Sequence, residues 1–207
     1  MTKKNILLAL TFGAVLSILC SVFIISNLYN IPYEKFTGDP ALIFKANPFI
    51  GVVSNIGILF WCCAACICLF SGLLLLSKDK DYSQFLIFSG FFSTILLLDD
   101  FFIIHDYGVF YIFPNDFSQK TILGLYALFA MWYLYKFQKI ILTTNFFILG
   151  AAFFFLGLSV LIDVVFESKG IQYFIEDGFK FIGITGWTLY FTSTSYELLS
   201  TKVLIKC

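Results

Sequence analysis

Six apolar stretches constrain this chain more than any other feature of its sequence, because each is close to the length that crosses a membrane. A helix spans the hydrocarbon core of a bilayer with about 20 predominantly apolar residues. The stretches lie at residues 5–29, 49–77, 83–106, 120–137, 140–166 and 176–200. Across the chain, 60% of the residues are hydrophobic and 13% are charged, against roughly 45–50% and 25% in soluble domains. The sequence predicts an all-α, polytopic transmembrane helical bundle of about six spans, which forms a single domain over residues 1–207.

The first stretch resembles a secretory signal, because Lys3 and Lys4 precede an apolar core. That core continues to Leu28, a length of about 24 residues, whereas a signal-peptide core has about 7–15. We therefore expect the segment to be retained as the first helix.

The distribution of charge predicts an orientation and a partner. All 13 basic residues are lysines, and six spans would place eight of them on the side of both chain ends and five on the other. Because the lysine-rich side faces the cytoplasm, we expect a bacterial plasma-membrane protein with both termini cytoplasmic. The formal net charge is zero and no basic stripe is present, which argues against a nucleic-acid partner and leaves the lipid bilayer as the expected one.

The most informative motif is LLLDDFFIIHD, residues 96–106, at the end of the third stretch. It places Asp99 and Asp100 inside an apolar segment, with His105, the single histidine of the sequence, just beyond them. Ionisable groups at membrane depth are costly, and they usually face a bundle interior or a water-filled cavity. This motif therefore marks a candidate site.

With six spans, two further acidic helix ends meet this motif on the outer side of the membrane. The predicted catalytic residues are Asp99, Asp100, His105 and Lys180. The predicted metal ligands are Asp99, Asp100, His105, Asp106, Asp163, Glu167, Glu176 and Asp177. In an unbroken helix, Asp100 and His105 would point about 140° apart. We therefore expect the partners of each to come from other helices.

Three interpretations of this acidic cluster remain open. A divalent metal would suit the oxygen-rich ligand set, and one imidazole would also admit Zn²⁺ or Fe²⁺. A carboxylate pair that shares a proton beside a histidine would suit a metal-free proton relay or general acid/base. A structural role would pair Asp99 or Asp100 with Lys180 and leave the other acids as solvated helix ends.

The sixth stretch contains the segment EDGFKFIGITGWTLY, residues 176–190. Gly183 and Gly186 would permit a close approach of neighbouring helices, and Lys180 and Trp187 are seven residues apart on one face. Four cysteines, at positions 62, 63, 66 and 68, lie together in the second stretch. One helix cannot direct four thiolates at one tetrahedral metal, so we interpret them as packing residues.

The pairing of LLLDDFFIIHD with EDGFKFIGITGWTLY resembles small multi-spanning bacterial integral membrane proteins with no assigned activity. This resemblance implies a membrane topology and no function. Membrane hydrolases such as the alkaline ceramidases, and the progestin/adiponectin-type receptors, hold a zinc ion with three histidines. One histidine cannot build that site, although a relative with carboxylates in place of histidines stays open.

From these residues we predict a metal-assisted, membrane-embedded hydrolase that acts on a lipid or another apolar small molecule. A divalent metal ion is the expected cofactor, and Lys180 would stabilise developing negative charge. The alternatives are a small transporter, channel or proton-relay sensor, which would need a polar path to the inner face. A non-catalytic membrane subunit would instead have fully paired aspartates and no cavity.

Overall fold

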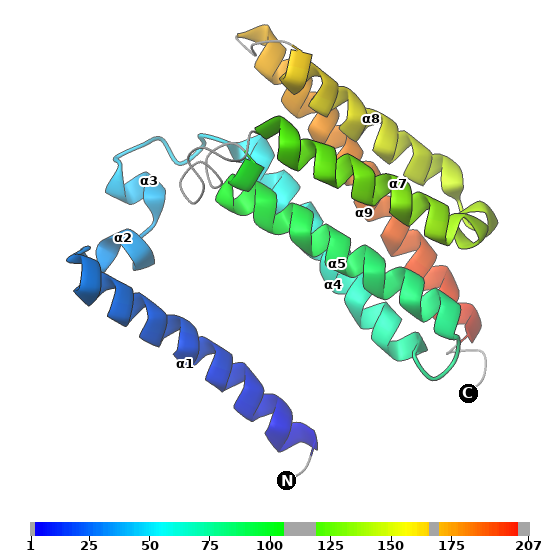
Figure 1. Ribbon diagram of the computed structural model, residues 1–207, viewed down its shortest axis with the longest axis horizontal. Helices are drawn as coiled ribbons and strands as arrows, with labels where there is room; N and C mark the ends of the chain where they lie inside the picture. The colour runs from blue at the N-terminus through cyan, green and yellow to red at the C-terminus, as the bar shows by residue number, and fades with distance from the viewer. Residues whose placement is uncertain (1–2, 106–118, 166–169, 203–207) are drawn as a thin grey trace. The chain divides into compact units, whose positions relative to one another are not determined.

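The computed structural model describes residues 3–105, 119–165 and 170–202, and these residues form eight helices (Figure 1). Four of the helices are long and apolar enough to cross a membrane: Thr11–Tyr29 within α1, Val52–Leu75 (α4), Lys80–Phe102 (α5) and Phe146–Val165 (α8). The chain is therefore an all-α integral membrane protein with four candidate spans. The two other predicted spans lie in the helices Gln119–Thr143 (α7) and Ile171–Lys202 (α9), and their crossing of the membrane stays a prediction.

Contacts divide the chain into two units, residues 1–50 and 51–207. The first unit contains α1 (Lys3–Tyr29), α2 (Glu34–Thr37) and α3 (Pro40–Ile43). The α3 helix begins where Asp39 accepts hydrogen bonds from the backbone N–H groups of Ala41, at 2.7 Å, and Leu42, at 3.3 Å. Proline occupies the first position of this helix, where its missing N–H costs nothing. The segment between the first two predicted stretches thus contains two short helices.

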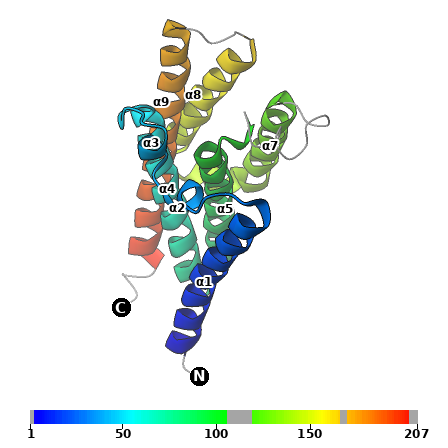
Figure 2. The same ribbon diagram turned by 90° about the vertical axis from the view of Figure 1, so that its left-hand side faces the viewer.

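The second unit is a helical bundle in which α4 lies beside α5 and α9 lies beside both α8 and α4 (Figures 1 and 2). Glycines bring these pairs close together. A Cβ atom at Gly90 would lie 2.6 Å from the Leu69 side chain, and one at Gly183 would lie 2.7 Å from that of Leu156. The predicted close approach at Gly183 is confirmed.

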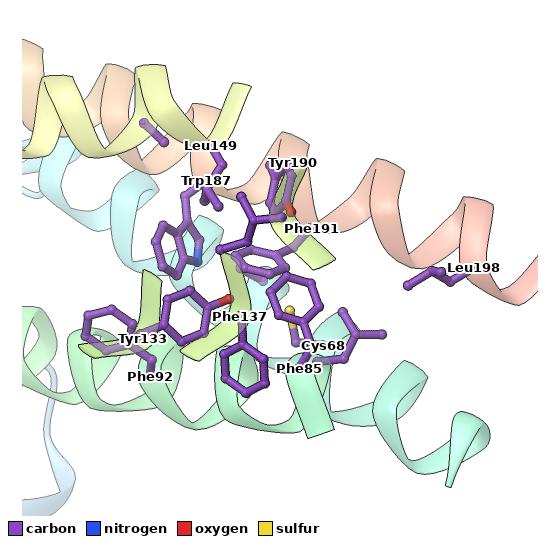
Figure 3. Close-up of a cluster of buried hydrophobic side chains, with 14 of the residues drawn as sticks. Cys68, Phe85, Phe92, Tyr133, Phe137, Leu149, Trp187, Tyr190, Phe191 and Leu198 are labelled. Atoms are coloured by element: carbon purple, nitrogen blue, oxygen red, sulfur yellow. The ribbon is translucent and has the colours of Figure 1, made fainter. Parts of the chain in front are cut away.

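The core of this bundle is aromatic, and the Trp187 indole lies at its centre (Figure 3). Its ring centroid is 5.7 Å from that of Trp61 on α4, 5.6 Å from Phe92 on α5 and 5.3 Å from Phe153 on α8. Large aromatic side chains dominate the energetics of such cores because each buries a large area. Trp187 therefore joins four helices in one hydrophobic contact.

Several predicted boundaries are wrong. The third span was expected to continue to residue 106, but α5 ends at Phe102. A turn was expected at residues 138–139, but both lie inside α7, which ends at Thr143. Gln and Lys are good helix formers, whereas the Thr-Thr-Asn sequence that follows favours backbone turns. The last helix begins at Ile171, five residues before the predicted start at Glu176.

The four cysteines of α4 differ in burial. The five cysteines that the structure describes are free thiols, and Cys68 is fully buried while positions 62, 63 and 66 are exposed on α4. Cys68 packs in the hydrophobic core, and a packing role for the other three stays a prediction.

Candidate functional site

The α5 helix ends one turn before His105 because the backbone reverses at Ile103. This residue has φ 52° and ψ 46°, the left-handed conformation, and its N–H bonds to the backbone carbonyl of Asp99. Because the chain reverses here, His105 lies back against the last turn of α5. Its backbone N–H donates to Asp99 Oδ1 at 3.0 Å, and its Nδ1 lies 2.6 Å from Asp99 Oδ2.

This reversal overturns the expectation that Asp100 and His105 cannot reach one ion. Ligand atoms of Asp99, Asp100 and His105 all lie within 4.8 Å of one another. The argument from helical angles assumed an unbroken helix, and a left-handed isoleucine removes that assumption. A β-branched residue in this conformation is uncommon and costs roughly 1–2 kcal/mol. No glycine, asparagine or proline in the segment signals the turn.

The second carboxylate has its own partners. Lys180 Nζ on α9 donates to Asp100 Oδ1 at 2.6 Å, and Trp61 Nε1 on α4 donates to Asp100 Oδ2 at 2.9 Å. The Asp100 side chain is only 9% exposed. An aspartate–lysine pair, one of the predicted alternatives, is therefore present.

The same face of α9 makes a second hydrogen bond to α5. Trp187 Nε1 donates to Ser93 Oγ at 2.9 Å. Trp187 is seven residues after Lys180, and Ser93 is seven residues before Asp100. The two contacts therefore share one antiparallel register. They confirm that Lys180 and Trp187 lie on one helix face.

A cavity of about 580 Å³ lies beside these residues, lined by side chains from α5, α7, α8 and α9 and by Trp61. Asp99, Asp100, His105 and Lys180 form part of its wall, together with Phe92, Leu134, Phe153, Leu156 and Trp187. The volume lies within the range of about 300–1,000 Å³ that small-molecule sites occupy. The acidic cluster therefore forms part of the wall of a largely apolar cavity.

The remaining predicted ligands divide into three groups. Asp163 lines the cavity and accepts a hydrogen bond at 2.8 Å from the Gln119 side chain. Glu176 also lines the cavity, whereas Asp177 is exposed and borders a separate small hollow next to Asp100 and Lys180. Asp106 and Glu167 lie outside the described residues.

Three residues of the site were missed in the sequence. Trp61 holds Asp100, and the Tyr126 phenol on α7 interacts with the Asp99 carboxylate. Ser159 on α8 lines the cavity and is only 5% exposed. A tryptophan in an apolar segment needs a hydrogen-bond acceptor, which is a usable signal for Trp61. A single serine in an apolar helix carries no such signal.

The comparisons with known proteins bear on the family alone. No curated protein and no solved structure matches the chain. One protein-family model matches residues 7–194, which is most of the sequence. The chain belongs to the family described as a domain of unknown function (DUF8692).

Proposed function

We propose that this protein is a membrane-embedded hydrolase that acts on a lipid or another apolar molecule held in the cavity. Asp99, Asp100 and His105 form its reactive centre and hold a divalent metal ion. The observation that carries the proposal is the position of this cluster in the wall of an apolar cavity of about 580 Å³. Ligand sites commonly combine an apolar wall with a few convergent polar groups.

The charge of the cavity wall supports a cation at this centre. Of the residues that the structure describes, four carboxylates line the cavity, those of Asp99, Asp100, Asp163 and Glu176, together with the ammonium group of Lys180. Like charges at short distance disfavour one another, so a divalent ion relieves repulsion that the lysine alone does not offset.

The residues of the site suit the chemistry of hydrolysis. Two carboxylates and an imidazole suit Zn²⁺, Mn²⁺ or Fe²⁺, and such an ion polarises carbonyl oxygens and acidifies bound water. The Asp99 carboxylate fixes the ring of His105 through Nδ1. Lys180 Nζ, at the same end of the cavity, stabilises negative charge that develops on a substrate oxygen.

We further propose that the chain crosses the membrane six times. We place α7 and α9 across the membrane together with the four candidate spans, with both termini cytoplasmic and one domain over residues 1–207. Support comes from their lengths of 25 and 32 residues and from the buried Tyr133 and Trp187 that join them to the bundle. The acidic cluster then faces the outer side of a bacterial plasma membrane.

Metal analysis of gently purified protein tests the metal centre. We expect about one equivalent of a divalent metal in the wild type, and its loss in the Asp99→Asn and His105→Ala variants. Asp81→Asn is the matched control, because Asp81 is an exposed carboxylate in the first turn of α5. Folded wild-type protein that holds no metal after supply of Zn²⁺, Mn²⁺ and Fe²⁺ would refute the metal centre.

A second candidate function, a metal-free proton relay, is favoured by a different observation. The 2.6 Å contact between Asp99 and His105 suits proton sharing, and buried hydroxyls continue along α5. Ser93 donates to the Ser89 carbonyl at 2.8 Å, and the Ser89 hydroxyl lies 2.6 Å from that of Tyr133. A proton flux into proteoliposomes that the Asp99→Asn variant abolishes, in protein without metal, would support the relay over the hydrolase.

A further inference from the structure

We infer that an acyl chain of a bilayer lipid occupies the cavity, and that it enters sideways from the hydrocarbon core through a mouth between α7 and α8. The inference rests on the proposed function, because the lipid that contributes this chain is the substrate of the hydrolase. It specifies the source of the substrate, its route into the cavity and the residues that form the mouth.

The cavity is not enclosed, and the lining residues that are exposed locate its opening. Among the described residues, the lining positions on α4, α5 and α9 are buried or half-buried. The exposed lining residues lie on α7 and α8, at positions Ala127, Met131, Gly157, Val160 and Leu161. We call these five residues the mouth. The cavity therefore opens to the outside of the bundle between α7 and α8.

Helix register places the two sides of the mouth at one level. Only two residues separate α7 from α8, so these neighbours are antiparallel (Figure 1). Met131 and Gly157 are 12 and 11 residues from the helix ends at this turn. Ala127 and Leu161 are 16 and 15 residues from the same ends. Because both helices rise about 1.5 Å per residue, each pair lies at about the same level, and the mouth extends for about 6 Å along the bundle.

The mouth reaches the level of the acidic cluster. The Tyr126 phenol interacts with the Asp99 carboxylate, and Ala127 is the next residue on α7. Two residues further along, the Phe129 ring centroid lies 4.7 Å from that of Phe92 on α5. The mouth therefore extends from the level of the acidic cluster toward the aromatic core of the bundle.

The composition of the mouth indicates what passes through it. Its five residues are apolar, and α8 is one of the four candidate membrane spans. A span is surrounded by lipid hydrocarbon, which is as apolar as a leucine side chain. An acyl chain therefore passes between α7 and α8 without a change of environment. A charged headgroup would instead pay a large cost at this depth, so it stays at the membrane surface.

The wall behind the mouth suits both the chain and the group that carries it. On α5 the lining residues run from Phe92 to Asp99, and on α9 they run from Trp187 to Lys180. Each pair is seven residues apart, about 10 Å along a helix. A chain that lies against the two aromatic residues thus brings its attachment to the headgroup toward Asp99 and Lys180. The proposed hydrolysis takes place at that end.

Quenching of tryptophan fluorescence by brominated lipid tests the inference. The full-length protein is reconstituted in vesicles of dioleoylphosphatidylcholine, or of the same lipid brominated at its double bonds. Trp61 and Trp187 line the cavity and are 2% and 0% exposed, so bromine in the surrounding bilayer does not contact them. Trp132 is 42% exposed and is replaced by phenylalanine in all samples. Bromine that an acyl chain carries into the cavity quenches the two remaining tryptophans.

The variant Gly157→Phe closes the mouth with an aromatic ring. A Cβ at Gly157 would meet nothing within 4 Å, so the backbone accepts a larger side chain. Gly150→Phe is the matched control, because Gly150 is exposed, lies seven residues earlier on the same face of α8, has equally open space and is not among the described lining residues. We expect brominated lipid to quench the parent protein and the control alike, and Gly157→Phe to lose most of that quenching.

A second variant closes the same mouth from the other helix, so the test does not depend on the folding of Gly157→Phe. Ala127→Phe places its ring on α7 and should lose most of the quenching as well. Its control is Gly124→Phe, at an exposed position of α7 where a Cβ would also meet nothing within 4 Å and which is not among the described lining residues. This control should be quenched like the parent protein.

Absence of quenching in the parent protein would overturn the acyl chain as the occupant. Quenching that Gly157→Phe and Ala127→Phe leave unchanged, or that the controls lose equally, would overturn the mouth as its route. None of these measurements requires a bound metal. Stoichiometric metal without quenching would therefore refute this inference alone, and quenching that the two mouth variants lose, in protein that binds no metal, would refute the metal centre alone.

Discussion

The ion pair between Lys180 and Asp100 offers the sharpest test of the site's energetics. The perturbation is a double-mutant cycle with Lys180→Met, Asp100→Asn and the double variant. Methionine keeps the length of the lysine stem without its charge, and asparagine keeps an oxygen that can accept from Trp61. Each single change therefore removes one charge with little change of shape.

The geometry sets the expected magnitude. The Nζ–Oδ1 distance is 2.6 Å, and the side chains are 32% and 9% exposed for Lys180 and Asp100 respectively. An exposed pair contributes about 0.2–1 kcal/mol, and breaking a fully buried pair costs about 3–5 kcal/mol. This pair lies between those limits, and Trp61 still solvates the carboxylate in Lys180→Met. We expect Lys180→Met to lower the free energy of unfolding by about 2 kcal/mol.

The asymmetry of exposure predicts unequal single variants. Asp100→Asn leaves an ammonium group that can reach water, so its cost should be smaller, about 1 kcal/mol. The coupling energy should be about 1.5 kcal/mol, near the upper end of the hydrogen-bond couplings measured within membrane proteins, which average about 0.6.

Equilibrium unfolding in mixed micelles measures the cycle. The protein is treated with EDTA so that loss of a metal ligand does not contribute to the Asp100→Asn value. A coupling energy below about 0.5 kcal/mol, or a Lys180→Met variant as stable as the wild type, would refute the reasoning that this lysine offsets a buried charge.

Three further predictions concern positions away from this pair. Gly157→Ala should raise the unfolding free energy by about 0.5–1 kcal/mol through helix propensity, because a Cβ there meets nothing within 4 Å. Its matched control Gly183→Ala should lower the unfolding free energy, because a Cβ there would approach within 2.7 Å of the neighbouring helix; the opposite order in thermal unfolding would contradict this. Ile103→Gly should raise the unfolding free energy by about 0.5–1 kcal/mol. It removes the strain of a left-handed isoleucine, and the greater conformational freedom of glycine in the unfolded chain offsets part of this gain. A loss of stability above about 1 kcal/mol would argue against that strain. The hydrogen bond from Lys202 at 2.5 Å lowers the pKa of the Asp79 carboxyl below its usual range, so stability that is present above about pH 4 should be lost as the pH falls through the lowered pKa. The pair is partly exposed, so this loss should stay below about 1 kcal/mol in acid titrations of stability, and Lys202→Ala should remove it.

Hydrophobic patterning was sufficient to predict the helical class, the membrane location and four candidate spans. It also predicted the face that Lys180 shares with Trp187, because helical periodicity alone determines which residues lie on one side. The positions at which helices end were harder to predict. The α7 helix passes through residues 138–139 because propensity there is high and no capping residue interrupts it.

The composition of the candidate site was predictable only in part. Asp99, Asp100 and His105 were identified because charge within an apolar segment is costly. Their convergence was not predictable, because it depends on the left-handed conformation of Ile103, a residue type that rarely adopts it. Ser159 was not predictable either, because its place in the cavity wall depends on how α8 packs in the bundle.

The cavity itself follows from the size of the residues at the helix contacts. Glycines at positions 72, 90 and 183 bring α4 against α5 and α8 against α9 until a Cβ would collide with the neighbouring helix. On α7, a Cβ at Gly124 would meet nothing within 4 Å, and this helix reaches α5 through aromatic rings such as Phe129, whose centroid lies 4.7 Å from that of Phe92. Because the distance between helix axes depends on the side chains at their contact, glycine contacts close one part of the bundle and aromatic contacts hold α7 away from it. The space left beside α7 is the cavity, and the acidic cluster lies in its wall because Asp99 and Asp100 stand where the α5 helix ends.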